Sequence, residues 1–502
     1  MKKRIILIMM VVAMLLMAFS LTGCGSKSGN SSTLNYGYGS DIDNFDPFTS
    51  QTTQFVCTVN FNCYECLMHL NADMEYEMDL ATSYEQKDEK TYVFSLREGV
   101  TFHNGEKFTA EDVIYTINTI KDPAVGAWRA SQYENVASVV ADGDYKVTIT
   151  LNKPQPGFLD NIAYTAIVSK STTPNQLKAQ PIGTGAFKFI SWTPNDNITF
   201  EKYADYWDAA NVHFDKFVYK VIPDASTGIA NLKSGAIQVF GNVGTEQAKT
   251  IEETDGLTVF KSKYANKVFE WEIGRHNNPA LADPEVIKAM FLCLDRDSIV
   301  NNIFNGMVDN AKSPFPSSAK YYYSADECKY DVEEAKKVLA NTAFKEGFSF
   351  KATVSGNTGE EYETLIIWQN ELKKIGIQLE IDVVDSSVWL DKYLGRTYDV
   401  ICNTYSMVGT DPATYCNVIL GALPDYQMSD LTELNQLISD AATSNDEKVR
   451  EEKYKAIQEL MVQYRPTTSY VESPSLSGAT SSLEGLVING MGHTFIKGAQ
   501  ID

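Results

Sequence analysis

The sequence predicts a mixed α/β fold, because segments with a two-residue apolar period alternate with segments of helical period. Residues 91–96 alternate polar and apolar side chains, as in a half-buried strand. Residues 109–112 (TAED) then have the form of a helix N-cap with an acidic first turn, and apolar residues recur at helical spacing until Pro123. Further on, residues 377–402 show the pattern strand, helix, strand with short links, which implies a parallel pair joined by a right-handed crossover.

The middle of the chain continues this alternation. Asp224 can cap a helix at 225–233, and Gly235 lies just beyond its end. The strands expected around this helix are 187–190, 198–201, 217–222 and 237–240.

The last third of the chain repeats the mixture with more helices than strands. Strands are expected at 377–383 and 398–402. One helix is expected to begin at Asp331. Four more helices are expected at about 361–374, 387–394, 431–439 and 447–464.

The N-terminus has the form of an export signal. Basic residues at 2–4 precede an almost unbroken apolar run at 5–19, and Leu21-Thr22-Gly23-Cys24 follows. These four residues resemble a bacterial lipobox, in which cleavage precedes a cysteine whose sulfur carries lipid. A membrane span is the alternative, but the run is shorter than the ~20 residues that a span needs. We therefore expect a lipoprotein signal peptide at 1–23 and lipid attachment at Cys24.

A short polar segment follows the expected cleavage point. Residues 24–33 are small and polar with no apolar pattern, which is typical of a flexible tether. The prediction is a folded body on the extracytoplasmic face of the membrane, at the cell surface or in the periplasm, held by its lipid anchor.

Composition restricts the partners. The 502 residues include 43 basic and 65 acidic side chains, giving a net charge of −22, and 44% are hydrophobic. Such a body repels nucleic acid and anionic lipid, so no nucleic-acid partner is expected. The acidic balance either favours cationic ligands or only keeps the surface solvated, and it does not locate a site.

Seven cysteines remain besides Cys24, an odd number that argues against a complete disulfide framework. Cys63 and Cys66 have the spacing of a redox or metal pair, but neither a second pair nor a histidine cluster accompanies them. Unpaired thiols are the first expectation, with disulfides or a metal site as alternatives.

Motifs for catalysis are missing. The sequence has no G-x-S-x-G elbow, no H-E-x-x-H and no phosphate-binding Walker loop. Residues 317–320 (SSAK) fit S-x-x-K, but they lie in a link rich in proline and serine. The five histidines are scattered. We expect no enzyme activity, no metal and no cofactor, and any energy for transport must come from a partner ATPase.

Several motifs occur in the order and spacing of one known family. The most specific block is 92–105 (YVFSLREGVTFHNG), which continues through 108–113 (FTAEDV). The other matching segments are 44–47 (NFDP), 64–65 (YE), 79–85 (DLATSYE), 181–187 (PIGTGAF), 205–207 (DYW), 294–296 (LDR), 372–377 (LKKIGI) and 411–412 (DP). On these residues the chain resembles the family-5 extracytoplasmic solute-binding proteins of ABC importers, which bind oligopeptides, dipeptides or nickel.

The resemblance implies a two-lobed periplasmic-binding-protein fold with mixed sheets and an extra subdomain. By analogy, lobe I is discontinuous, and the extra subdomain, domain II, is inserted into it. The implied spans are 34–60, 182–268 and 474–502 for lobe I, 61–181 for domain II, and 269–473 for lobe II.

The resemblance and the strand pattern together suggest ligand-binding residues. Trp389 and Tyr405 flank the strand at 398–402, whose carboxyl end is expected to face the cleft, so each either contacts ligand or packs in the core. Asp411 is either a turn residue or an anchor for a ligand amine. Peptide binders of the family commonly have an aspartate where this chain has Val408, and dipeptide binders have an arginine near 359–362, which here reads GEEY.

The predicted function is that of a lipid-anchored, monomeric receptor that captures a small solute by hinge closure and delivers it to an ABC permease and its ATPase. A peptide is the first expectation for the solute. An oligosaccharide or a nickel chelate is the alternative, because both family anchors for peptide termini are absent. A surface adhesin or chaperone-like lipoprotein is a further alternative, and a secreted hydrolase is the least favoured.

Overall fold

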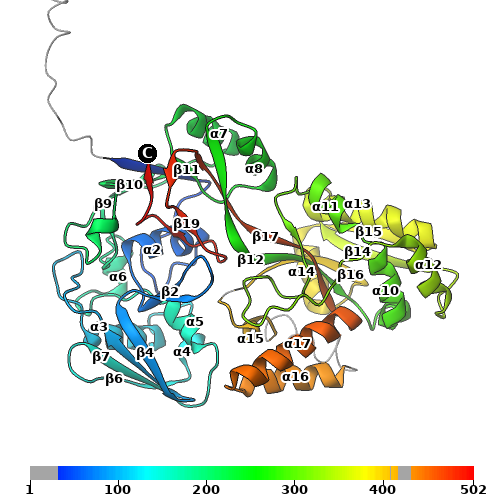
Figure 1. Ribbon diagram of the computed structural model, residues 1–502, viewed down its shortest axis with the longest axis horizontal. Coiled ribbons are helices and arrows are strands. Elements are labelled where there is room, and N and C mark those ends of the chain that lie inside the picture. The colour runs from blue at the N-terminus through cyan, green and yellow to red at the C-terminus, as the bar shows by residue number, and fades with distance from the viewer. Residues whose placement is uncertain (1–31, 408, 417–430, 502) are drawn as a thin grey trace, which may run out of the picture.

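The computed structural model describes residues 32–407, 409–416 and 431–501, and it contains two bodies joined by two long strands (Figure 1). These strands, β12 (Leu257–Ile273) and β17 (Thr467–Thr480), pair antiparallel over most of their length. The ladder shifts register on both sides of Ala265, which lies opposite Pro474. A proline cannot donate a ladder hydrogen bond, so the pairing is weakest where the chain passes between the bodies.

One sheet of eleven strands runs through both bodies. Its order is β15-β14-β16-β12-β17-β11-β1-β10-β9-β8, with β13 paired to β17. β1 is parallel to β10 and β11, and β14 is parallel to β15 and β16. The remaining strands are β1 (Thr33–Tyr38), β8 (Phe187–Thr193), β9 (Asn197–Lys202), β10 (Lys216–Val221), β11 (Val239–Phe240), β13 (Asp309–Asn310), β14 (Ser349–Ser355), β15 (Gln378–Val384) and β16 (Val400–Ser406).

The lobe I end of this sheet is covered by two helices and by the C-terminal segment. The elements are η3 (Ala209–Asn211), α7 (Ala225–Ser234), α8 (Thr245–Glu252), and the paired short strands β18 (Leu483–Glu484) with β21 (Gln500–Ile501) and β19 (Val487–Ile488) with β20 (Thr494–Phe495). Asp224 accepts a hydrogen bond from the N–H of Thr227 and so caps α7, and Gly235 ends it at φ +74°.

Domain II is built on a separate four-stranded sheet of order β4-β5-β7-β6, below lobe I in Figure 1. Tyr92, Phe94 and Leu96 of β5 are buried, and the capping box of Thr109 and Asp112 begins α3, so both predictions for this region are confirmed. η2 (Phe55–Val59) lies at the end of the first lobe I span, and α2 (Asn60–Cys63) leads into domain II. The other elements are β2 (Met68–Leu70), β3 (Tyr76–Met78), β4 (Ala81–Asp88), β5 (Thr91–Leu96), α3 (Ala110–Lys121), α4 (Ala130–Tyr133), β6 (Val136–Ala141), β7 (Lys146–Leu151), α5 (Phe158–Ala163) and α6 (Pro174–Leu177).

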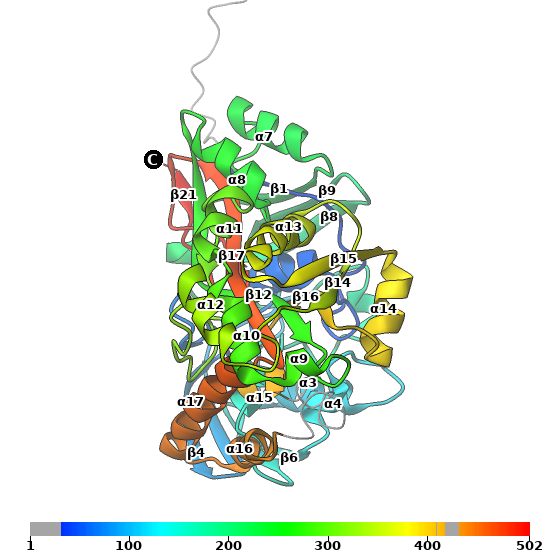
Figure 2. The same ribbon diagram turned by 90° about the vertical axis from the view of Figure 1, so that its right-hand side faces the viewer.

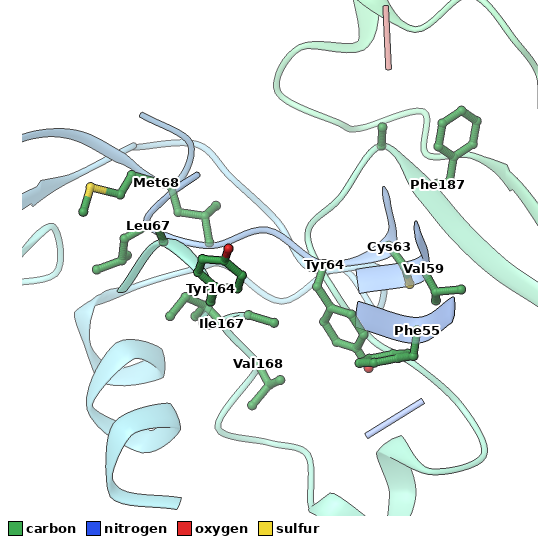
Figure 3. Packing of buried hydrophobic residues seen from close by; sticks show 14 of the residues in the cluster. Phe55, Val59, Cys63, Tyr64, Leu67, Met68, Tyr164, Ile167, Val168 and Phe187 are labelled. Atoms are coloured by element: carbon green, nitrogen blue, oxygen red, sulfur yellow. The ribbon is translucent and has the colours of Figure 1, made fainter. Parts of the chain in front are cut away.

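A continuous apolar core joins lobe I to domain II. Figure 3 shows part of it, with Tyr64 beside Phe55 and Tyr164 beside Ile167. The Tyr64 hydroxyl donates to the carbonyl of Phe45 at 2.9 Å, which satisfies the buried polar end of the ring.

Lobe II has its own core, centred on the stacked indoles of Trp271 and Trp368 with ring centroids 4.2 Å apart. Figure 2 looks onto this lobe, with α10 and α12 beside the sheet and α16 and α17 below. The elements are α9 (Pro279–Ala282), α10 (Pro284–Leu292), α11 (Arg296–Asn302), α12 (Val332–Ala340), α13 (Glu360–Leu372), η4 (Lys373–Ile375), α14 (Ser386–Gly395), α15 (Pro412–Tyr415), α16 (Thr432–Thr443) and α17 (Glu447–Tyr464).

The crossover predicted at 377–402 has one more strand than expected. β15 and β16 are not neighbours, because β14 lies between them and pairs with both in parallel. β15 is therefore an edge strand, and its Val383 is 43% exposed although the alternation predicted a buried position.

Candidate functional site

A cavity of about 580 Å³ lies where β12 and β17 cross between the two bodies. This size and position are typical of a small-molecule site. Lobe I contributes Tyr36, Tyr38, Asn242 and Thr245, and domain II contributes Trp128. The crossing strands contribute Asn266, Lys267 and residues 473–477, and lobe II contributes Phe269, Phe304, Glu360, Ser406 and Met407. Both bodies and the crossing strands therefore line one space.

Lys267 and Glu360 bring opposite charges to the cavity. The Lys267 ammonium lies 4.5 Å from the ring centroid of Phe269, and within the described residues it has no ion pair or hydrogen bond. Burial lowers the pKa of Lys267, while the charges of Glu360 and Glu361 oppose that shift. An ammonium in this position is available to an anionic group of a ligand.

Carboxylates occupy the first turn of α13. Glu360 accepts a 3.4 Å hydrogen bond from the hydroxyl of Thr245 in lobe I, so it bridges the bodies. Glu361 accepts a 2.9 Å hydrogen bond from the hydroxyl of Thr404, and burial raises its pKa. The helix start therefore presents acidic groups where the resemblance to dipeptide binders led us to look for an arginine.

The wall opposite lobe II carries a polar atom that the protein leaves unsatisfied. Trp128 lines the cavity, and its indole nitrogen is buried without a partner among the described residues. His493, also in the wall, stacks on Phe61 at 4.1 Å, and burial lowers its pKa to about 3. A neutral imidazole and an open indole donor favour a ligand with hydrogen-bond acceptors.

Tyr405 lies at the edge of this site. It is half-buried on β16 with its ring 4.9 Å from that of Tyr415, and it directly precedes the lining residues Ser406 and Met407. Tyr405 itself is not part of the cavity wall. Its role in ligand binding stays a prediction.

Trp389 lies farther along lobe II, on α14. Its indole N–H donates to the carbonyl of Cys402 at 3.0 Å, and its ring stacks on Tyr393 at 5.0 Å. It does not line the 580 Å³ cavity, and its contact with ligand also stays a prediction.

Asp411 is buried and already has a cationic partner. Its carboxylate oxygens accept hydrogen bonds of 2.7 and 2.9 Å from Arg450, and one of them also caps α15 by accepting from the N–H of Ala413. The sequence left two alternatives for Asp411, a turn residue or an anchor for a ligand amine, and this geometry is that of a turn residue. Two other predicted positions, Cys24 and Val408, lie outside the described residues.

A second cavity of about 920 Å³ lies between domain II and lobe II. Tyr164 lines both cavities, so the two are neighbours. Arg129, Asp160 and Asp411 also line the second cavity.

Several of the family-like motifs, 64–65, 92–105 and 205–207, meet at another place, the junction of lobe I and domain II. Glu65 accepts 2.8 Å hydrogen bonds from the Tyr206 hydroxyl and the Trp207 indole, and the guanidinium of Arg97 lies 3.7 Å from the Trp207 ring centroid. Burial, reinforced by the charge of Asp79, raises the pKa of Glu65 to about 7. These motifs hold two units together and do not line the interlobe cavity.

Other chemistry has little support in the part of the chain that the structure describes. The seven cysteines after Cys24 are all free there, including Cys63 and Cys66. Those residues contain no group of three or more His, Cys, Asp or Glu side chains placed to hold a metal ion. Within the same ranges, no helix has the length and apolar character needed to cross a membrane.

Comparison with known proteins gives the family. The profile of the bacterial extracellular solute-binding proteins, family 5, matches residues 75–427. The chain belongs to this family. Family 5 is a group of solute-binding proteins and not of enzymes, which agrees with the prediction made from the missing catalytic motifs.

Relatives align with this family-5 chain over nearly its full length. The oligopeptide-binding protein AppA of Bacillus subtilis is 28% identical over 531 aligned positions, covering 97% of this chain and 96% of AppA. The glutathione-binding protein GsiB of Escherichia coli K12 is 24% identical, covering 90% and 91%. The crystal structure of the ABC transporter substrate-binding protein CtaP from Listeria monocytogenes has a TM-score of 0.83 at 21% identity, covering 94% and 99%. This likeness confirms the predicted two-lobed fold.

Proposed function

We propose that this protein is a lipid-anchored receptor that captures peptides outside the cell membrane and delivers them to an ABC importer. The observation that carries the proposal is a cavity enclosed by both bodies and by the two strands that join them. The names of the relatives add support, since AppA is an oligopeptide-binding protein and GsiB a glutathione-binding protein. The permease and its ATPase are the partners that this role requires.

Capture works by closing the lobes on the ligand. A ligand that contacts Tyr38 or Trp128 on one side and Phe304 or Glu360 on the other makes all of its contacts only when the lobes are closed. Binding then shifts the equilibrium toward the closed form by its differential affinity for the two forms. The interrupted ladder at Ala265 and Pro474 is the natural hinge for this motion.

The cavity suits a peptide because it combines aromatic surface with scattered polar groups. Tyr36, Tyr38 and Phe269 supply stiff apolar area, while Asn242, Asn266 and Ser406 supply hydrogen-bond partners for main-chain amides. β14 pairs with β16 only at Val400 and Ile401, so an extended peptide beside the remainder of β16 gains main-chain hydrogen bonds that tolerate varied side chains.

Native mass spectrometry of the purified mature chain tests the proposal. A ladder of bound masses that fits short peptides is the expected result. One discrete mass that fits a sugar or a metal chelate would replace peptide by the alternative ligand class. A chain that binds nothing, even when mixed with a peptide pool, would overturn the receptor role.

A further inference from the structure

Arg129 is a buried cation between the two cavities. It lies at the start of α4 and is 7% exposed. Its guanidinium carbon lies 5.2 Å from the ring centroid of Trp128, which lines the interlobe cavity, and 5.1 Å from that of Tyr164, which lines both cavities. Arg129 itself lines the cavity between domain II and lobe II.

The protein does not neutralise this guanidinium within the residues that the structure describes. Its Nε donates to the side chain of Gln132 at 2.7 Å, and no carboxylate lies within ion-pair distance of it there. Burial lowers the pKa of Arg129, and the opposing effect of nearby groups, including the charge of Asp160, does not cancel that shift. Arginine remains protonated in proteins, so the charge itself persists.

The nearby acidic groups are committed to other partners. Asp411 pairs with Arg450 at 2.7 Å. Asp160 accepts from the N–H of Thr410 at 2.8 Å and from the hydroxyl of Tyr76 at 2.7 Å. No ion pair joins either carboxylate to Arg129 among the described residues, and Arg129 lines the cavity between domain II and lobe II.

We propose that Arg129 binds a carboxylate of the captured ligand, and so acts as an anchor that selects anionic or free-acid peptides. This inference rests on the peptide-binding function proposed above. A planar guanidinium with its Nη groups unpaired matches a carboxylate in two parallel hydrogen bonds. The flanking rings of Trp128 and Tyr164 hold the fork in place and exclude water from it.

Arg129 supplies a cation for a ligand carboxylate, which the start of α13, where dipeptide binders of the family have an arginine, does not supply in this chain. The start of α13 presents Glu360 and Glu361, which repel a carboxylate. A buried carboxylate without a cation would cost most of the binding free energy. Lys267 also lines the interlobe cavity, but the charges of Glu360 and Glu361 act on it, whereas Arg129 has no ion pair among the described residues.

The test uses peptide pools and calorimetry on the mature chain. One pool contains random tri- to pentapeptides without Asp or Glu as free acids; the second contains the same peptides amidated at the C-terminus; the third is amidated but carries one Glu. The wild type is expected to bind the free acids at least about tenfold more tightly than the neutral amides. Recovery of binding with the third pool would show that a side-chain carboxylate can replace the terminal one, and no recovery would show that the anchor requires the C-terminal carboxylate.

Variants identify the residue. Arg129→Met is expected to remove the preference for free acids, and Arg129→Lys to retain part of it. Lys153→Met is the matched control, because Lys153 is an exposed cation in the wall of the same cavity. Circular dichroism checks that each variant folds, and the wild-type comparison of pools stands even if Arg129→Met does not fold.

The outcomes separate the two proposals. Equal binding of free acids and neutral amides by the wild type would overturn the anchor while leaving peptide capture intact. A folded Arg129→Met that keeps the full preference would overturn it as well. Binding of none of the pools would overturn the proposed function itself.

Discussion

Asp160 of domain II accepts a 2.8 Å hydrogen bond from the backbone N–H of Thr410 in lobe II. The same carboxylate accepts from the N–H of Asp411 at 2.9 Å and from the Tyr76 hydroxyl at 2.7 Å. Gly409 permits this approach, because it adopts φ +81° and a Cβ there would lie 2.8 Å from an Asp160 oxygen. This contact joins the two bodies at a point separate from the crossing strands.

Replacing Asp160 is therefore expected to loosen the closed form. Both N–H groups donate to one Asp160 oxygen, which the Asn carbonyl can replace, but the other oxygen accepts from the hydroxyls of Tyr76 and Thr410. Asn presents its amide NH₂ there, so the Tyr76 hydroxyl loses its acceptor. Such a loss costs about 1–3 kcal/mol. We expect Asp160→Asn to have a larger radius of gyration by small-angle scattering in the ligand-free form, and weaker binding of a peptide pool by calorimetry.

The matched control is Asp142→Asn, which changes an exposed aspartate of domain II that pairs with Lys146. It is expected to leave both measurements unchanged. Scattering curves of Asp160→Asn that superimpose on those of the wild type would show that the contact does not bias closure.

The buried pair of Asp411 and Arg450 makes a separate prediction about stability. Arg450→Met leaves the Asp411 carboxylate buried without its cation, which is expected to lower the free energy of unfolding by about 3–5 kcal/mol. Combining it with Asp411→Asn removes the orphaned charge and is expected to recover part of that loss. Urea denaturation measures the free energy of unfolding of the wild type, of Arg450→Met and of the double variant, with the exposed Lys448→Met as control. A double variant less stable than Arg450→Met would contradict this account.

The periodic elements could be predicted from sequence because their local signals agree with their burial. The Asp224 cap, the Gly235 stop and the full span of α17 are examples. The crossing strands β12 and β17 were missed. β17 (TTSYVESPSLSGAT) is rich in Ser and contains Pro474, so it lacks the apolar alternation of a strand, and its pairing partner lies some 200 residues away in sequence.

The site was harder to predict than the fold. Glu360 was noticed only as a departure from an expected arginine, and Lys267 was not noticed, because a lysine in a strand gives no sign of which space it faces. Arg129 was missed for the same reason. Arg129 has no ion-pair partner among the described residues, and the nearby Asp160 and Asp411 bond to other groups. These two residues lie 31 and 282 positions further along the chain, so no local sequence pattern indicates their contacts.

His493 predicts a loss of stability in acid. Burial lowers its pKa to about 3, whereas the unfolded chain has the ordinary value of 6.5. Below pH 6.5 the unfolded chain therefore takes up a proton that the folded protein refuses, and stability falls as the pH falls toward 3. Relative to the wild type, His493→Gln is expected to lose about 2 kcal/mol less between pH 6.5 and 4.5.

The comparison must be made between variants, because other groups titrate in the opposite sense. Burial raises the pKa of Glu65 to about 7 and that of Glu270 to about 8, so these two groups favour the folded state as the pH falls. Urea unfolding at a series of pH values gives the slopes, with the exposed His213→Gln as control. Parallel curves for His493→Gln and the wild type would exclude the role of His493.

Tyr405→Ala tests the aromatic residue at the edge of the cavity. Removing a half-buried ring next to Ser406 and Met407 is expected to weaken peptide binding by about tenfold or more, with the circular dichroism spectrum unchanged. Tyr330→Ala, at an exposed tyrosine, is the control. Calorimetry that gives the same affinity for Tyr405→Ala and the wild type would remove Tyr405 from the site.

Cys24→Ser tests the lipid anchor. A serine hydroxyl does not accept the diacylglyceryl group that a lipobox cysteine receives, so the variant is expected to appear in the soluble fraction after cell lysis, while the wild type sediments with membranes. Each buried methylene contributes about 0.8 kcal/mol of membrane affinity, so losing the acyl chains abolishes stable attachment. Cys57→Ser is the matched control, because it removes one thiol from the folded body and leaves residues 21–24 intact. Cys24→Ser that still sediments in high salt would contradict the anchor and point to retention of the apolar segment at 5–19.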